Sequence, residues 1–302
     1  SITHELLDVV LDRGTMDIAD DLAVPLPVIV IAELLGVPPQ DRRQFKKWSD
    51  TLVEGAAENT KEAVSAVLME KRQALAELIG YFQEMIGRRR NDPKADLISL
   101  LLAAEIEGEK LSEEEVINFS ILLLAAGNET TTNLITNAVR RLTEDEALQK
   151  RLSGQLGLMP AFIEEVLRFY PPIQGIGRIA MRDVEVGGKT IKAGDQVVSW
   201  VASANRDETK FANPGAFLLD RSQNPHLSFG FGPHFCLGAP LARLEGQIAI
   251  RAILERAKHI RRTPGVELTP VPSPFVFGVK HLPVAFESKQ EGMFASDPAD
   301  MV

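Results

Sequence analysis

The sequence predicts a mainly α-helical protein with small peripheral β-sheets. In the first two-thirds of the chain, apolar residues recur with the 3.6-residue period of helices that bury one face. One long segment carries a complete helix-start signal, whereas the short strand-like runs are confined to the last third. The helices expected before the long one lie near residues 4–12, 27–36, 40–53, 61–90 and 96–105.

The long central helix is expected to cover about 112–142. Ser112 can cap its first turn, and Glu115 can return the reciprocal hydrogen bond of a capping box. Leu111 can pack against Val116 as a hydrophobic staple. These local signals fix where the helix begins more firmly than where it ends.

The last third is expected to mix helices, strands and irregular chain. A helix that begins near Pro160 should end before Pro171-Pro172, because the residue before a proline disfavours helical geometry. Another should run from Ala239 or Pro240 to Lys258. The remaining expectations are strands near 183–186 and 196–201, irregular chain over 205–234, short strands within 272–286, one domain over 1–287 and a disordered tail over 288–302.

Composition narrows the function classes. With 33 Lys plus Arg against 42 Asp plus Glu, the net charge of -9 disfavours nonspecific binding to nucleic acid or to an anionic membrane surface. No apolar run approaches the roughly 18 residues of a membrane span, so no membrane insertion is expected. The single cysteine excludes an internal disulfide, and no secretion signal precedes the first helix, so we expect a cytoplasmic protein.

The only cysteine, Cys236, lies directly before the helix that Pro240 helps to start. A helix N-terminus presents unpaired N–H groups and positive dipole potential, which favour a thiolate, and Gly232 and Gly238 permit close backbone approach. A lone cysteine is more often a small buried hydrophobic residue. A cysteine hydrolase would need a base near the sulfur, and His234 on the same tight loop is poorly placed for that role.

Two further motifs carry weaker signals on their own. Within the long helix, Gly127 and the threonines at 130–132 are locally unfavourable, and a threonine hydroxyl can bond backward to a carbonyl and open a notch. A threonine-rich buried helix explains this segment about equally well. Glu165 and Arg168, three residues apart on one helix, would ordinarily be a weak surface ion pair.

The segment from Phe229 to Ala239 is similar, position by position, to the haem-ligand loop of the cytochrome P450 family. The resemblance extends in the expected order from about Leu6 to Phe286. It implies the P450 fold and a haem b cofactor (iron protoporphyrin IX), with Cys236 as the axial ligand to iron. It also implies cofactor contacts from Phe229, Gly230, His234, Gly238, Arg178 and Ala126.

The same resemblance assigns the remaining motifs. Glu129 and Thr130 match the family's acid–alcohol pair, which handles protons during catalysis. Glu165, Arg168 and Arg221 match a structural ion-pair network that ties the ligand loop to the helical body, and Asn205 belongs to a structural turn. Substrate-facing positions implied by the family are apolar or nearly so: Leu123, Ala126, Ile173, Ile176, Val276 and Phe277.

The resemblance therefore predicts a haem-thiolate monooxygenase that inserts one oxygen atom from dioxygen into a small apolar organic substrate. Electrons should come from a separate ferredoxin or flavodoxin-type donor. A peroxide-using or isomerising relative is disfavoured by the pair Glu129 and Thr130. The family's N-terminal portion is absent from this chain, so we expect an N-terminally truncated fold; the alternative is a non-catalytic fragment that keeps the motifs but binds haem poorly.

Overall fold

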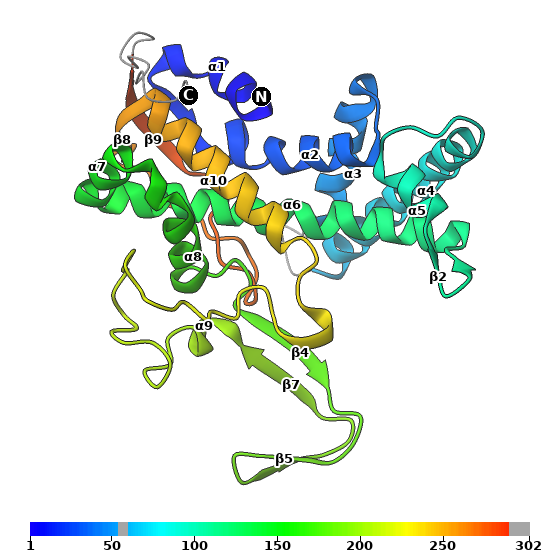
Figure 1. Cartoon of the computed structure of the whole chain (residues 1–302). Coiled ribbons are helices and arrows are strands. Elements are labelled where there is room, and N and C mark those ends of the chain that lie inside the picture. The colour runs from blue at the N-terminus through cyan, green and yellow to red at the C-terminus, as the bar shows by residue number, and fades with distance from the viewer. Residues whose placement is uncertain (54–59, 290–302) are drawn as a thin grey trace, which may run out of the picture. The chain divides into compact units, whose positions relative to one another are not determined.

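The computed structural model describes residues 1–53 and 60–289, and the chain divides into two compact units. The first comprises residues 1, 3–21 and 133–302, and the second comprises residue 2 and residues 22–132. Of the disordered tail expected over 288–302, Ser288 instead belongs to a strand and the Lys289 N–H donates to the Arg256 carbonyl at 2.8 Å, whereas 290–302 lie outside the described residues. One helix, α6 (Glu113–Glu144), contributes its first part to the second unit and its last part to the first unit (Figure 1).

The second unit is built from helices and one small hairpin. Its elements are α2 (Pro25–Leu35), a 3-10 turn (Pro39–Asp41), α3 (Arg42–Val53), α4 (Lys61–Asn91), α5 (Leu97–Ala103), β2 (Glu105–Ile106) and β3 (Glu109–Lys110), followed by the start of α6. Apolar side chains that are at most 5% exposed form its core: Leu26, Ile31, Leu35, Phe45, Leu78, Phe82, Ile98 and Leu124.

The first unit holds the remaining helices and three of the sheets. Its helices are α1 (Ile2–Asp8, whose first residue is grouped with the other unit), α7 (Glu146–Gly154), α8 (Met159–Phe169), α9 (Val201–Ala204) and α10 (Ala239–Arg256). Helices α8 and α10 lie side by side and share a core with the end of α6 (Figure 1). Its centre consists of Leu134, Ile135, Val139, Phe162, Ile163, Val166, Ala249, Ile250 and Ile253.

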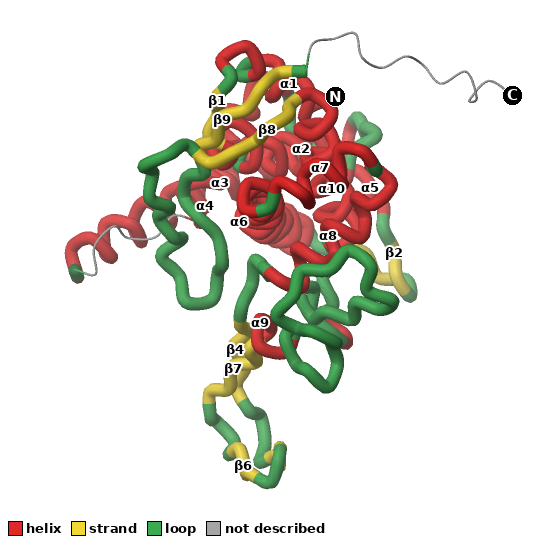
Figure 2. The backbone as a smooth tube through the Cα atoms, turned by 90° about the vertical axis from the view of Figure 1, so that its left-hand side faces the viewer, coloured by secondary structure: helices red, strands yellow, loops and turns green. Residues whose placement is uncertain are grey.

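All strand pairs in the first unit are antiparallel. The strands are β1 (Thr15–Asp17), β4 (Gly175–Ile179), β5 (Val184–Val186), β6 (Lys189–Ile191), β7 (Gln196–Trp200), β8 (Ala257–Arg262) and β9 (Pro283–Ser288). Strands β1, β9 and β8 form a three-stranded sheet, whereas β4 pairs with β7 and β5 with β6 (Figure 2). Small sheets accompany a helical body, so the predicted fold class is confirmed.

The start of α6 follows the sequence prediction. The Ser112 N–H donates to Glu115 Oε2 at 2.8 Å, and the Glu115 N–H donates to Ser112 Oγ at 3.2 Å. These two bonds are the reciprocal pair of a capping box. The helix then continues two residues past the expected end at 142.

Several element boundaries differ from the sequence predictions. The helix expected over 4–12 ends at Asp8, and a 3-10 turn at Leu11–Arg13 leads into β1. Helix α10 ends at Arg256 instead of Lys258, because Ala257 is extended and pairs with Ser288 of β9. Strands β1, β2, β3, β4, β6 and β8 were not expected, since each is short and depends on a partner distant in sequence or across a turn. The helix expected over 96–105 ends at Ala103, and β2 begins at Glu105.

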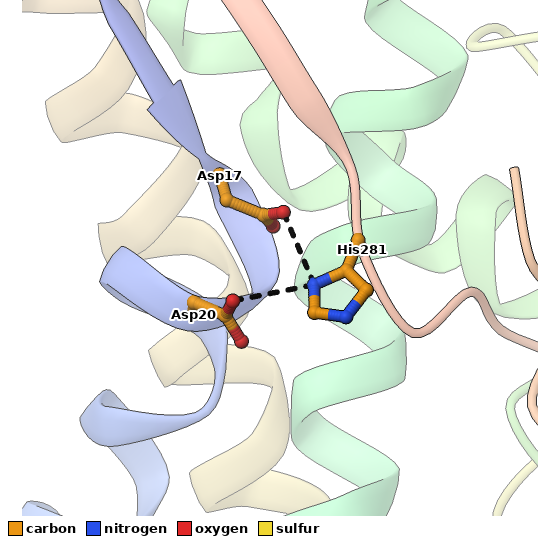
Figure 3. Close-up of side chains that lie close together, drawn as sticks. All are labelled: Asp17, Asp20 and His281. Atoms are coloured by element: carbon orange, nitrogen blue, oxygen red, sulfur yellow. Dashed lines mark ion pairs between the residues drawn. The ribbon is translucent and has the colours of Figure 1, made fainter. Parts of the chain in front are cut away.

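A charged cluster joins the N-terminal strand to the chain before β9. His281 Nδ1 lies 3.3 Å from Asp17 Oδ2 and 3.2 Å from Asp20 Oδ2 (Figure 3). Asp17 Oδ1 also accepts the backbone N–H groups of Ala19 and Leu282, at 2.9 and 3.0 Å. Because the bonded groups are local turns and strand ends, we interpret the cluster as a structural tie within this unit.

Candidate functional site

Cys236 lies in a tight loop whose backbone is fixed by local geometry. Its N–H donates to the Phe229 carbonyl oxygen at 2.9 Å. Gly230 and Gly232 both adopt φ of +75°, a conformation that side chains with a Cβ rarely tolerate. A 3-10 turn at Gly232–His234 and the start of α10 at Ala239 flank the cysteine. The loop therefore presents the sulfur at the N-terminal end of a long helix, as the sequence predicts.

The thiol of Cys236 is exposed. A buried hydrophobic cysteine, which residue type alone would favour, is therefore wrong for this protein. Among the described residues no histidine is hydrogen-bonded to the sulfur, which also disfavours the cysteine-hydrolase alternative.

Exposed apolar side chains lie close to Cys236 along the loop. Phe231 is 88% exposed, Leu237 is 73% exposed and Phe235 is 52% exposed. Apolar groups gathered beside a single sulfur ligand are what a flat, mostly apolar cofactor such as haem would cover. The donor set also fits, because one thiolate is the protein ligand of a haem-thiolate site.

Two predicted cofactor contacts are exposed cationic or titratable side chains. Arg178 lies on β4, and its Nη1 donates to the adjacent Gly177 carbonyl at 2.8 Å. His234 ends the 3-10 turn before Cys236. Neither side chain forms an ion pair within the described part of the chain, so both are available to anionic groups of a cofactor.

The predicted ion-pair network is present, and its central pair is fully buried. Glu165 and Arg168 are 0% exposed and form a bidentate pair, with Nη2 to Oε1 at 2.7 Å and Nε to Oε2 at 2.8 Å. Arg221 Nε lies 3.0 Å from both Glu165 oxygens. A weak surface pair, the ordinary interpretation of this spacing, is therefore excluded.

The same network fastens the irregular chain that precedes the ligand loop. Arg168 donates to the carbonyls of Asn205, Pro214 and Ala216 at 3.0, 2.9 and 2.8 Å. Asn205 is buried, and its amide nitrogen donates to the Arg168 carbonyl at 3.2 Å. The expected structural role of this turn is confirmed by these bonds.

A second charge network, which residue spacing does not predict, lies beside the first. In the first unit Glu164 forms an ion pair with Arg243, with Nε to Oε1 at 2.7 Å, and Glu164 Oε2 lies within hydrogen-bond distance of His226 Nε2 at 3.1 Å. The only local signal is an acid adjacent to Glu165. The two partners lie 62 and 79 residues away in the chain, so spacing alone could not reveal them.

The predicted acid–alcohol pair lies on the part of α6 that belongs to the second unit. Thr130 Oγ1 donates to the Ala126 carbonyl at 2.9 Å, which is the backward bond that the sequence suggests. Burial raises the pKa of the neighbouring Glu129, and the charge of Lys71 opposes that rise. Ala126 is exposed and Leu123 is half-buried on the same helix.

Neighbours of this pair explain the unusual composition of the segment. The Asn128 amide donates to Ser49 Oγ at 2.7 Å in a buried contact, and Thr132 Oγ1 donates to the Ala23 carbonyl at 2.9 Å. A Cβ at Gly127 would lie 3.4 Å from Ile31, so the glycine lets α6 approach α2 closely. Packing against the other helices of the unit thus accounts for Gly127, Asn128 and Thr132.

The remaining predicted substrate positions lie in the first unit. Ile173 and Val276 form an isolated antiparallel bridge, so the two residues lie on adjacent segments of the backbone. Ile176 is on β4 and is half-buried. The Phe277 ring stacks on Tyr170 with centroids 5.4 Å apart and lies near Arg140, so it has packing partners of its own.

Comparisons with known proteins match the chain to the family that its ligand loop resembles. The family model described as Cytochrome P450 matches residues 32–280. Cytochrome P450 109 of Bacillus spizizenii is 52% identical over 289 residues, which are 95% of this chain and 71% of that protein. Steroid C26-monooxygenase of Mycolicibacterium smegmatis is 36% identical over 281 residues, 93% of this chain and 69% of that one.

Solved structures give the same result. The substrate-free crystal structure of CYP109E1 from Bacillus megaterium has a TM-score of 0.92 and 47% identity, over 95% of this chain and 75% of that one. The complex of CYP109E1 with testosterone has a TM-score of 0.89 and 46% identity, over 94% and 76% of the two chains. No helix in the described residues is long and apolar enough to cross a membrane.

Proposed function

The chain belongs to the cytochrome P450 family of haem-binding monooxygenases, and from that premise we propose that Cys236 is the axial ligand to the haem iron. The observation that carries the proposal is the exposure of this one thiol at the start of α10, among exposed apolar side chains. The thiolate at this position is supported by the N–H groups and dipole of the helix. Bound haem would supply dioxygen activation and transfer of one oxygen atom.

Residues around the loop are proposed to hold the rest of the cofactor. Arg178 and His234 would bind its propionates, because both are exposed and neither is ion-paired in the described residues. Phe229, Gly230 and Gly238 would contact it next to the sulfur. A Cβ at Gly238 would lie 3.9 Å from Cys236 Sγ, so glycine leaves the approach to the sulfur open. Ala126 completes the proposed set from α6.

Proton handling is proposed for Glu129 and Thr130. The Thr130 hydroxyl is both a donor and an acceptor, and its bond to the Ala126 carbonyl holds it in a defined rotamer. Glu129 has a raised pKa because it is half-buried, so it keeps a proton to higher pH than an exposed glutamate does. A group of that kind can exchange a proton with solvent and pass it to the threonine hydroxyl.

The proposed substrate is a small apolar organic molecule, with steroids as the first candidates. The positions proposed to face it are Leu123, Ala126, Ile173, Ile176, Val276 and Phe277, and apolar linings of this kind favour apolar ligands. Relatives with steroid ligands in their names support this choice, since CYP109E1 was solved with testosterone. We further propose a ferredoxin or flavodoxin-type electron donor and, from the single cysteine, a reducing cytoplasmic location.

Haem reconstitution tests the ligand assignment. The chain is loaded with haem, reduced and exposed to carbon monoxide, and the absorption spectrum reports whether a thiolate binds the iron. We expect the thiolate-type spectrum in the parent protein and its complete loss in Cys236→Ala, with helical content preserved because the loop packing does not depend on the sulfur. A thiolate-type spectrum in Cys236→Ala would exclude the assignment, and Ala257→Ser serves as a substitution control away from the loop.

Thr130→Ala tests the proton pathway in the haem-loaded protein supplied with a ferredoxin, its reductase and a steroid that binds. Electrons should continue to flow, but the share recovered in product should fall about tenfold and peroxide should rise, because the hydroxyl that delivers protons is lost. Thr130→Ser keeps the hydroxyl and should retain most of the coupling. Equal coupling in the alanine and serine variants would remove Thr130 from the proposed mechanism.

A further inference from the structure

A second charge network, formed by Glu164, Arg243 and His226, contacts the ligand loop at Phe229 and is separate from the Glu165 network. Glu164 on α8 accepts two bonds from Arg243 on α10, from Nε to Oε1 at 2.7 Å and from Nη2 to Oε2 at 3.0 Å. Glu164 Oε2 also lies 3.1 Å from His226 Nε2. Although burial alone would raise the pKa of Glu164, hydrogen bonds from His226 and Arg243 lower it to about 2. The carboxylate is therefore ionised at neutral pH.

The orientation of His226 follows from its second ring nitrogen. The Ser228 backbone N–H donates to His226 Nδ1 at 3.3 Å, so Nδ1 is the acceptor and Nε2 carries the proton that Glu164 accepts. The ring is 3% exposed, which fixes it between α8 and the ligand loop. Ser228 is fixed in turn, because its hydroxyl donates to the Leu167 carbonyl at 2.7 Å.

Both partners of Glu164 lie against Phe229. The guanidinium carbon of Arg243 is 4.5 Å from the centre of the Phe229 ring, within cation–π range. The His226 ring centre lies 6.0 Å from the same ring. Phe229 is also the residue whose carbonyl accepts the Cys236 N–H at 2.9 Å. The Glu164 carboxylate thus orients Arg243 and His226. These two side chains contact Phe229, whose carbonyl accepts the hydrogen bond from the Cys236 backbone.

We propose that Glu164, acting through Arg243 and His226, is a positioning residue that holds Phe229 and thereby the Cys236 thiolate in place for haem ligation. The proposal rests on the proposed function, since it requires Cys236 to be the ligand. Its role differs from that of Glu165, whose hydrogen-bond donors are Arg168, Leu218, Arg221 and Asn224, none of which lies in the ligand loop. Disturbing Glu164 should loosen thiolate ligation while leaving the buried Glu165 network intact.

The test uses the haem-loaded full chain and compares Glu164→Gln with the parent protein. The readout is the rate at which the reduced carbon monoxide complex loses its thiolate-type spectrum, measured together with haem content and thermal unfolding. We expect this rate to rise about fivefold or more in Glu164→Gln, because neutral glutamine replaces charge-assisted hydrogen bonds with weaker ones. Glu164→Asp, which keeps the charge, should recover part of the parent behaviour.

Glu255→Gln is the matched control. Glu255 accepts from Arg251 Nε at 2.7 Å, so it belongs to a glutamate–arginine pair near the C-terminal end of α10, the same helix that carries Arg243. This variant should keep the parent rate. An equal rate in Glu164→Gln, Glu255→Gln and the parent would overturn the proposal.

A second variant and a double-mutant cycle keep the test decisive. If Glu164→Gln does not fold, Arg243→Lys replaces it, because lysine keeps the charge but not the planar group over Phe229. An unchanged rate of spectral loss in Arg243→Lys would overturn the proposal. In a Phe229→Leu background, Glu164→Gln should have a smaller effect, since the ring that transmits it is gone. Absence of the thiolate-type spectrum in the parent protein would instead reject Cys236 as ligand, which is a distinct failure.

Discussion

Two glutamates of the first unit are buried in opposite surroundings, one among hydrogen-bond donors and the other without them. Glu165 on α8 is 0% exposed and accepts hydrogen bonds from Arg168, Arg221, Asn224 and the Leu218 N–H. Glu245 on α10 is 5% exposed, and within the described residues its Oε2 has no hydrogen-bond partner. Burial raises the pKa of Glu245 to about 8. A buried carboxyl group that lacks hydrogen-bond donors keeps its proton to higher pH than an exposed one.

The contrast shows which of the two glutamates holds the fold together. Removing a carboxylate that neutralises two buried guanidinium groups leaves uncompensated charges, whereas removing an unpartnered carboxyl group relieves a desolvation cost. Conservative substitutions at the two positions should therefore change the free energy of unfolding in opposite directions at pH 8. Three substitutions test this difference.

Glu165→Gln should give the largest loss. Glutamine keeps the shape but leaves Arg168 and Arg221 without a counter-charge, which typically costs about 3–5 kcal/mol in a buried pair. Denaturant unfolding of the haem-loaded protein measures the change. Glu185→Gln makes the same substitution on exposed β5 and should be nearly neutral, so equal effects of the two variants would contradict a central role for Glu165.

Arg168→Lys should cost less, about 2–3 kcal/mol, because the charge remains while hydrogen bonds are lost. Arg168 makes five side-chain bonds, two to Glu165 and three to backbone carbonyls, and an ammonium group has only three donors. The unfolding free energy and protease cleavage within 205–221 report the change. Unchanged protection of that segment would show that Arg168 does not fasten it.

Glu245→Gln should have the smallest effect and the opposite sign. The pKa of Glu245 is about 8 in the folded protein, against an ordinary value of 4.5 in the unfolded chain. Between pH 4.5 and pH 8, folding therefore takes up a proton. The free energy of unfolding consequently falls as the pH rises through this range. Below pH 4.5 both states are protonated and no penalty applies. The variant should be about 1–2 kcal/mol more stable at pH 8, since the burial cost of the amide offsets part of the gain.

The measurement for Glu245 is the unfolding free energy of parent and variant at pH 5 and at pH 8. The difference between the two proteins isolates this group from all others that titrate in the same range. A difference that does not change with pH would mean that Glu245 is ionised in the folded protein. In that case an unrecognised donor must reach its carboxylate.

Much of the ligand loop could be predicted from sequence because its conformation is local. Glycines at 230 and 232 adopt the positive φ that the tight loop requires, and Ala239 begins the helix where the sequence places it. The capping box at Ser112 was equally local and equally well predicted. The short strands were not, because β1 pairs with β9 from the other end of the chain and has too few residues to show a period.

The sequence by itself determined the helical class, the family and the place of the single cysteine before α10, because these depend on residue types at fixed short spacings. Only the tertiary structure decided which of two adjacent glutamates is buried among arginines and which one faces the ligand loop. Arg221 and Arg243 reach Glu165 and Glu164 across 56 and 79 residues of chain, and no local pattern encodes that choice. The pKa of Glu245 has the same origin, since desolvation depends on what packs around a residue and not on its neighbours in sequence.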